Sequence, residues 1–243
     1  MSVTILRAIQ IALLALVLPV TAQAQSSAPA ELVPLNTYTD YAIGSDTAPL
    51  EIIEYASFAC PACKNWHDQV WSWLKPEFVD TGRVRFVLRP IVTPPNEVAA
   101  ASAIMAECAG PDRYFEASGL LFDAQPDIFD AIRNQGDVLG VYHGVGANIG
   151  VSPEAFSACL QDPAKSQRIG ETIALAGTDE VAGTPTFVID GQTLNRAMID
   201  GEAILVWGGE PLIVNGERLP ANYGEDNFRR IVLHFLNESD SDQ

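Results

Sequence analysis

Two cysteines three positions apart, Cys60 and Cys63, restrict what this chain can fold into more than any other feature of its sequence. They follow an apolar stretch, 50–55, that is typical of a buried strand, and they begin a stretch, 60–78, whose apolar residues recur at helical spacing. A helix that starts at Cys60 places its sulfur where free N–H groups and the positive end of the helix dipole favour a thiolate. Because Cys63 lies one turn later, it can close a disulfide with Cys60 and reopen it on another protein. The motif therefore predicts redox chemistry.

The N-terminus has the pattern of a secretory signal peptide over residues 1–24. Arg7 precedes an apolar run over 8–20, and small residues that suit signal peptidase follow it. Because this run is too short to cross a hydrocarbon core about 30 Å thick, a cleaved signal is expected rather than a membrane anchor. We predict a periplasmic protein whose mature chain begins with a flexible arm over 25–40, which is rich in Ala, Ser and Pro.

The acidic composition excludes one class of partner. The chain has 31 Asp and Glu residues, 14 Lys and Arg residues and a net charge of −17. Nucleic-acid phosphates would repel such a surface, so no nucleic-acid partner is expected. The charge favours a soluble monomer, and a special affinity for basic clients is the alternative. The four cysteines form an even set, and an oxidising compartment would allow them to pair.

Strand and helix signals divide the chain into three parts. The predicted strands are 50–55, 84–88, 186–189 and 212–214. Only helical signals lie between the second and the third strand, and neither half of such a sheet could bury its faces alone. We therefore predict an α/β fold in which 41–95 and 178–238 form one domain, with a helical insertion over 96–177.

Residues typical of helix ends support this division. Asn96 is a candidate N-cap for the first helix of the insertion, and Ser152 followed by Pro153 predicts another helix start. The amphipathic pattern over 225–236 predicts a C-terminal helix, after which we expect a disordered tail over 239–243.

Two turn signals lie in the C-terminal part of the chain. Asp190-Gly191 and Asn215-Gly216 are typical of β-hairpins. The stretch between them, 192–210, is longer than a short hairpin requires. We interpret it as a lid or a specificity element beside the redox motif.

Three features together resemble the thioredoxin superfamily, and within it the exported DsbA-like thiol–disulfide oxidoreductases. The first is the segment 54–63, in which Glu54 precedes Cys60 by six residues. The second is Val-Ala-Gly-Thr-Pro-Thr-Phe at 181–187, which looks like the cis-proline loop of the superfamily, and the third is the helical stretch between them. The resemblance covers about 40–238 and implies a thioredoxin fold, a central mixed sheet flanked by helices, with an inserted all-helical domain.

The resemblance implies a role for each residue of the site. Cys60 would be the exposed attacking and leaving sulfur, and Cys63 the buried resolving one. Glu54 would be a buried carboxylate that takes a proton from Cys63; an acid at an exposed strand edge is the alternative. Thr184 would bind an extended client peptide beside a cis Pro185, and a plain trans turn is the alternative.

Cys108 and Cys159 resemble the second, structural disulfide of some alphaproteobacterial-type DsbA proteins. A second redox pair is the alternative, but these two cysteines lack the close spacing of the redox motif. A zinc site would need four ligands in two close pairs, so no metal is expected, and thiol exchange requires no organic cofactor. His67 lies on the predicted helix and is expected to pack or cap rather than catalyse.

The leading prediction is a periplasmic oxidase that donates the Cys60–Cys63 disulfide to reduced exported proteins. A DsbB-like membrane partner linked to quinones would reoxidise it. A reductase or isomerase is one alternative, and a chaperone-like peptide-binding module in which the disulfide is incidental is another. Ala62 stands where strongly oxidising relatives often carry histidine, so we predict a less oxidising disulfide than theirs.

Overall fold

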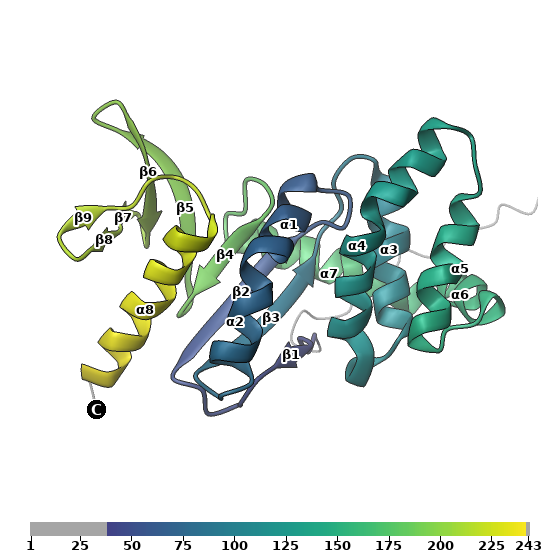
Figure 1. Ribbon diagram of the computed structural model, residues 1–243, viewed down its shortest axis with the longest axis horizontal. Coiled ribbons are helices and arrows are strands. Elements are labelled where there is room, and N and C mark those ends of the chain that lie inside the picture. Colours follow the sequence, from purple (N-terminus) through teal and green to yellow (C-terminus); the bar gives the residue numbers. More distant parts are fainter. Residues whose placement is uncertain (1–37, 242–243) are drawn as a thin grey trace, which may run out of the picture. The chain divides into compact units, whose positions relative to one another are not determined.

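The computed structural model describes residues 38–241 (Figure 1). The predicted signal peptide and residues 25–37 of the predicted arm lie outside the described residues. The fold class expected from the sequence, a mixed sheet with helices, is confirmed. None of the helices within the described range has both the length and the hydropathy that a membrane crossing requires.

A seven-stranded mixed sheet forms the centre of the fold. β2 and β3 are parallel, as expected for strands joined by a helix, and all other neighbouring strands are antiparallel. In their order across the sheet, the strands are β1 (Ala42–Ile43), β3 (Val84–Pro90), β2 (Leu50–Ala56), β4 (Thr186–Ile189), β5 (Gln192–Ile199), β6 (Glu202–Trp207) and β7 (Glu210–Pro211). A separate hairpin consists of β8 (Ile213–Val214) and β9 (Glu217–Arg218).

One continuous helical run follows β2. Its α- and π-helical segments are α1 (Pro61–Trp66), η2 (His67–Trp71), α2 (Ser72–Leu74) and η3 (Lys75–Val79). Cys60 is the N-cap, and Pro61 favours a start here because the first helical position needs no N–H partner. The predicted helix over 60–78 is therefore confirmed.

Five α-helices lie between β3 and β4. They are α3 (Asn96–Cys108), α4 (Tyr114–Arg133), α5 (Val138–Ile149), α6 (Pro153–Gln161) and α7 (Pro163–Thr178), with a 3-10 turn, η4 (Pro111–Arg113), before α4. Ser152 caps α6 as expected, because its hydroxyl accepts a hydrogen bond from the Ala155 N–H at 3.2 Å. The prediction for Asn96 was wrong: Pro95 is the N-cap of α3, and no side chain caps this helix.

The C-terminal helix is longer than its apolar pattern indicated. We expected a helix over 225–236 and a disordered tail over 239–243, whereas α8 spans Glu225–Ser241. A helix that has formed can continue through polar residues, because each added residue gains a backbone hydrogen bond. Residues 242–243 lie outside the described residues.

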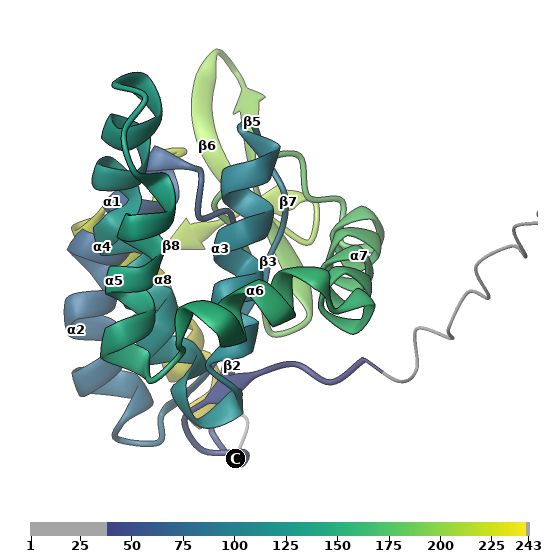
Figure 2. The ribbon, with the colours of Figure 1, turned by 90° about the vertical axis from the view of Figure 1, so that its right-hand side faces the viewer.

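Helices cover both faces of the sheet. Ile52 and Phe187 on one face belong to the large core that also contains α1, α2 and α8, whereas Ile53 on the other face packs with Ala176 of α7. Figures 1 and 2 accordingly show α7 on the opposite side of the sheet from α1 and α2. Because alternate residues of a strand point to opposite faces, Glu54 lies on the same face as Ile52, under α1.

Residues 192–210 form part of the sheet rather than a lid. They contribute β5 and β6, joined by a turn at Asp200-Gly201, and the start of β7. Four of the first five residues of β5 are polar, so the sequence shows no alternating apolar pattern there. The hairpin turns expected at Asp190-Gly191 and Asn215-Gly216 are confirmed, since they join β4 to β5 and β8 to β9 with positive φ at all four residues.

The last residues of the predicted flexible arm are fixed against the domain. Asp40 accepts two hydrogen bonds from Arg89 of β3, at 2.9 and 2.8 Å. The Thr39 carbonyl accepts another from Arg168 of α7. Residues 38–40 are therefore held by two partly buried cations, contrary to the expectation that the whole of 25–40 is flexible.

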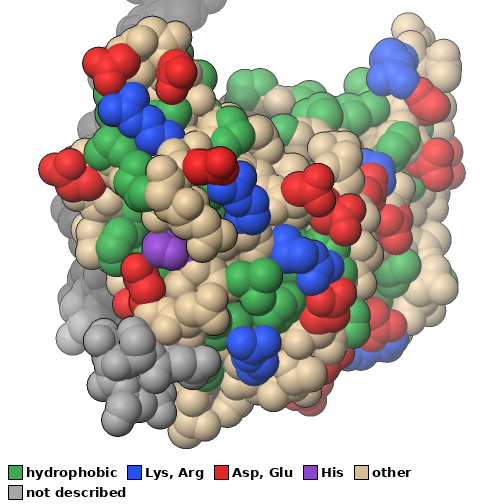
Figure 3. Space-filling view, turned by 60° about the vertical axis from the view of Figure 1, so that its left-hand side comes forward, with side chains coloured by type: hydrophobic (Ala, Val, Ile, Leu, Met, Phe, Trp, Pro, Cys, Tyr) green, Lys and Arg blue, Asp and Glu red, His purple; other side chains and the backbone are tan. Residues whose placement is uncertain are grey.

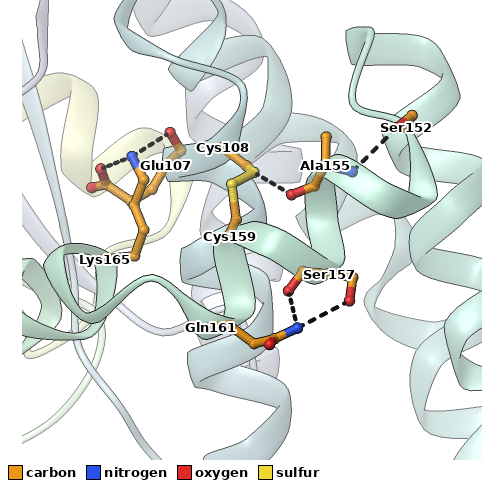
Figure 4. The surroundings of a disulfide bond; sticks show 8 residues. All are labelled: Glu107, Cys108, Ser152, Ala155, Ser157, Cys159, Gln161 and Lys165. Carbon is orange, nitrogen blue, oxygen red and sulfur yellow. Dashed lines mark hydrogen bonds and ion pairs between the residues drawn. A yellow bond between two sulfur atoms is a disulfide. The ribbon is translucent and has the colours of Figure 1, made fainter.

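A disulfide joins Cys108, at the end of α3, to Cys159 in α6, with Cα atoms 6.1 Å apart (Figure 4). Beside it, the buried carboxylate of Glu107 lies 2.7 Å from Arg168 Nε and 3.9 Å from Lys165 Nζ. The bond and this ion cluster fasten α3 to α6 and α7. They lie within the helical stretch between β3 and β4.

Candidate active site

Cys60 lies where β2 leads into α1, and it is partly exposed. Its backbone is extended (φ −92°, ψ 116°), and its carbonyl accepts hydrogen bonds from the N–H groups of Cys63 (3.1 Å) and Lys64 (3.2 Å). A hydrogen bond from the Cys63 thiol lowers the pKa of Cys60 to about 5, against the opposing effect of burial. The Thr184 side chain and the backbone N–H groups of Cys63 and Ala62 lower this pKa further.

Cys63 has the opposite environment. It is fully buried, and its sulfur accepts a hydrogen bond from the Ser57 N–H at 3.4 Å. Burial raises the pKa of Cys63 well above its ordinary value, and the hydrogen bond to Cys60 and the charge of Glu54 raise it further. At neutral pH the pair therefore holds one thiolate and one thiol.

We expect the reduced protein to contain a Cys60 thiolate at pH 7. A pKa of about 5 leaves nearly all of Cys60 ionised, whereas a free cysteine with a pKa of about 8.5 is ionised to only a few per cent at this pH. The ultraviolet absorbance of the thiolate should therefore be lost only as the pH falls through about 5.

Two variants test the cause of this low pKa. Cys63→Ala removes the main hydrogen-bond donor and should raise the midpoint of the Cys60 titration. Cys63→Ser keeps a donor at the same position, so its midpoint should stay lower than that of the Ala variant. Equal midpoints in the two variants would contradict the role assigned to the Cys63 thiol.

Glu54 and His67 form a buried pair next to the two cysteines. His67 Nε2 lies 3.0 Å from Glu54 Oε2, and the side chains are 8% and 0% exposed, respectively. Burial raises the pKa of Glu54, the charge and hydrogen bond of His67 oppose this rise, and the charge of Cys60 adds to it. Glu54 Oε1 and His67 Nδ1 have no hydrogen-bond partner among the described residues. One oxygen of a carboxyl group with a raised pKa is thus available to exchange a proton.

The pairing of His67 with Glu54 was not predicted from the sequence. His67 also packs, as expected: its ring stacks on Phe122 of α4 at 4.2 Å between centroids, and it meets Trp66 edge-on. One signal was present, because His67 follows Cys63 by four positions and so lies on the same face of the helix. The sequence did not show that Glu54, which lies in β2, points toward the helix face that carries His67.

Thr184 and Pro185 lie beside Cys60. The peptide bond between them is cis, and the Thr184 carbonyl can accept a hydrogen bond from Cys60 Sγ, 3.4 Å away, when this sulfur is protonated. β4 begins at Thr186 and pairs with β2, which holds the loop next to the end of β2. Within the described residues, the Thr184 N–H donates no hydrogen bond to a backbone carbonyl. This open backbone could bind an extended peptide.

Gln125 of α4 connects the helical insertion to the redox motif, and it too was missed in the sequence. Its buried side chain donates hydrogen bonds from Nε2 to the carbonyl oxygens of Phe58 (2.7 Å) and Cys60 (3.2 Å). Phe122, nearly one turn earlier, packs on Phe58 with 4.8 Å between ring centroids. No local signal could have revealed Gln125, because its partners are 67 and 65 positions away.

The structure gathers the residues expected to act in exchange into one site. These residues are Glu54, Cys60, Cys63, Thr184 and Pro185. The disulfide-bonded cysteines lie outside this site, in the helical insertion. Within residues 38–241, no group of three or more His, Cys, Asp or Glu side chains is placed to hold a metal ion.

Two relatives of known sequence match about two thirds of the chain. A Rickettsia conorii protein named as a protein-disulfide oxidoreductase is 26% identical over 162 residues, which are 66% of this chain and 57% of that protein. A Rickettsia typhi protein of the same name is 28% identical over 167 residues, which are 66% of this chain and 58% of that protein. The matches therefore span less than two thirds of the length of these relatives.

Solved structures share the fold, and a family model matches most of the chain. Wolbachia pipientis alpha-DsbA1 has a TM-score of 0.63 and 21% identity, covering 87% of this chain and 96% of its own. Oxidised BdbD from Bacillus subtilis has a TM-score of 0.60 and 20% identity, covering 82% of this chain and 93% of its own. The model described as thioredoxin matches residues 36–202, a span that contains both the redox motif and the cis-proline loop. The chain therefore belongs to the thioredoxin family.

Proposed function

We propose that this protein is an exported thiol–disulfide oxidoreductase that donates the Cys60–Cys63 disulfide to reduced client proteins. The observation that carries the proposal is the contrast between the two thiols: the pKa of Cys60 is lowered to about 5, and that of Cys63 is raised by burial. A sulfur that is stable as a thiolate leaves readily, so a disulfide that contains it is a good donor. The names of the Rickettsia relatives support the same reaction class.

Transfer requires two exchange steps. In the first, a client thiolate attacks Cys60 Sγ, the Cys60–Cys63 bond breaks, and Cys63 leaves as a thiolate that takes up a proton. In the second, another client thiolate attacks the client sulfur of the mixed disulfide, and Cys60 leaves as a thiolate that needs no proton. The two client thiols are oxidised to a disulfide, and the protein gains the same two electrons.

Glu54 is the proposed source of the proton for Cys63. Its carboxyl group has a raised pKa, its charge acts on Cys63, and its Oε1 atom has no other partner among the described residues. When the protein is reoxidised, the proton moves back, because the Cys63 thiol must lose it in order to attack Cys60. His67 holds the other oxygen and acts as a positioning residue.

The cellular setting belongs to the same proposal. The predicted signal peptide supports a periplasmic location, and a quinone-linked membrane protein of the DsbB kind would accept the electrons. The open Thr184 backbone would hold the client through contacts that do not depend on its side chains. Ala62 contributes only its backbone N–H to the Cys60 thiolate, which fits the predicted weaker oxidising power.

Replacing Cys63 with Ser tests the proposal. Cys60 can still attack a client disulfide and release one client thiol, but the variant has no Cys63 thiol to break the mixed disulfide that results. Exported proteins should therefore accumulate in mixed disulfides with the variant. Non-reducing electrophoresis and mass spectrometry would identify them, and Cys60→Ser, which lacks the attacking sulfur, is the matched control. If Cys63→Ser traps no protein, a peptide-binding module is favoured instead. If the trapped clients carry mispaired disulfides, an isomerase is favoured.

A further inference from the structure

A cavity of about 320 Å³ opens beside the redox motif. Ala62 and Trp66 of α1, Pro185, Arg196 of β5 and the loop before α8 line it. Two of these residues lie near Cys60. Ala62 belongs to the redox motif, and Pro185 follows Thr184, whose carbonyl contacts Cys60 Sγ. An extended peptide advances about 3.3 Å per residue, so the neighbours of a client cysteine held at Cys60 would reach this cavity.

Arg196 is the one charged residue among the described residues that line the cavity. It is exposed and forms no ion pair within residues 38–241, where every other Lys or Arg except Arg83 pairs with a carboxylate. Figure 3 shows this pairing on one face, where most Lys and Arg side chains lie against Asp or Glu. In a chain of net charge −17, an uncompensated cation beside the reactive cysteine is a distinctive feature.

Tyr223 fixes the position of the Arg196 guanidinium group. Cζ of Arg196 lies 4.3 Å from the centroid of the Tyr223 ring. The ring is itself held, because Tyr223 is buried and its hydroxyl donates a hydrogen bond to the Leu194 carbonyl at 2.7 Å. A guanidinium that stacks on a ring keeps its N–H edge open, and this edge matches the two oxygens of a carboxylate.

We propose that Arg196 binds an acidic side chain of the client close to the client's reacting cysteine and gives the protein a preference for such clients. This inference rests on the proposed donation of the Cys60–Cys63 disulfide. The net negative charge of the protein acts against acidic peptides, but screening limits that effect to about 8 Å at physiological ionic strength. Inside the cavity Arg196 is the nearest charge, so a client carboxylate gains charge-assisted hydrogen bonds there that a neutral amide does not.

Matched peptides test the preference. Each contains two cysteines and carries either Glu or Gln at one of the two positions on either side of the first cysteine. We measure the rate at which each peptide reduces the oxidised protein. In the natural protein, Glu in the position that enters the cavity should react about threefold to tenfold faster than Gln, and added salt should reduce this ratio.

Variants of Arg196 assign the effect to this residue. Arg196→Gln should bring the Glu-to-Gln ratio to about one, and Arg196→Glu should invert it. Arg83→Gln is the matched control, because Arg83 is the other described cation without an ion pair and follows the far end of the helical run that begins at Cys60. An equal ratio in the natural protein and in Arg196→Gln would overturn the inference. If none of these proteins oxidises any peptide, the proposed function itself fails.

Discussion

Removal of the Cys108–Cys159 disulfide is expected to lower the free energy of unfolding by about 4 kcal/mol. The bond joins residues 51 positions apart, and a cross-link of this length restricts the unfolded chain far more than the folded one. The packing of α3 on α6 remains, so the folded structure should persist while its resistance to denaturant falls. Denaturant unfolding of the Cys108→Ala/Cys159→Ala variant, followed by circular dichroism, measures the loss.

Single substitutions are the matched control for this prediction. Cys108→Ala and Cys159→Ala each break the same bond, so each should cost about as much as the double substitution rather than half of it. Free thiols at both positions in natively purified protein would contradict the prediction. Under conditions in which the double variant is folded, it should oxidise clients at the natural rate. A loss of activity under these conditions would favour a second redox pair.

Elements whose signals lie within a few residues were predictable from the sequence. The turn at Asp190-Gly191 and the helix start at Cys60-Pro61 depend on local backbone chemistry, and both occur where expected. β5 was not predicted, because four of its first five residues are polar and its apolar residues do not alternate with polar ones. Asn96 is not a cap because it is itself the first residue of α3, and the residue before it, Pro95, is the N-cap.

The site was predictable as far as its residues belong to contiguous motifs. Cys60, Cys63 and Thr184 each lie in a short segment that resembles the family, and the spacing to Cys60 also indicated Glu54. The pairing of His67 with Glu54 and the hydrogen bonds of the Gln125 side chain required the folded structure. Which helix face meets which strand depends on packing between distant segments, and a single sequence carries no direct signal for it.

Replacement of Glu54 with Gln is expected to slow the closing of the Cys60–Cys63 disulfide about 100-fold. Gln has nearly the same shape and can still hydrogen-bond to His67, but it cannot accept the proton of Cys63. Because burial raises the pKa of Cys63, few of these thiols ionise without an acceptor. When the reduced variant is mixed with oxidised glutathione, the mixed disulfide at Cys60 should therefore accumulate, and mass spectrometry of quenched samples follows its decay.

Stability separates this catalytic effect from structural damage. Burial raises the pKa of Glu54 in the folded protein. The protonated carboxyl group therefore adds to the stability of the fold at low pH. This contribution is lost as the pH rises through the raised pKa of Glu54. Gln does not titrate, so Glu54→Gln should be slower than the natural protein but more stable at neutral pH. Glu51→Gln, on the same strand but partly exposed and paired with Arg85, should close its disulfide at the natural rate. A Glu54→Gln variant that is both slower and less stable would indicate damage to the fold.

The substitution His67→Gln tests whether His67 sets the pKa of the proton acceptor, Glu54. The charge and hydrogen bond of His67 hold down the pKa of Glu54, and Gln carries no charge, so the substitution should raise that pKa further. Glu54 would then stay protonated to a higher pH, and the pH at which disulfide closing reaches half its maximal rate should move upward. At high pH the variant should approach the natural rate, because the acceptor is still present. If this pH does not change in the variant, His67 contributes to the site only by packing against Phe122 and Trp66.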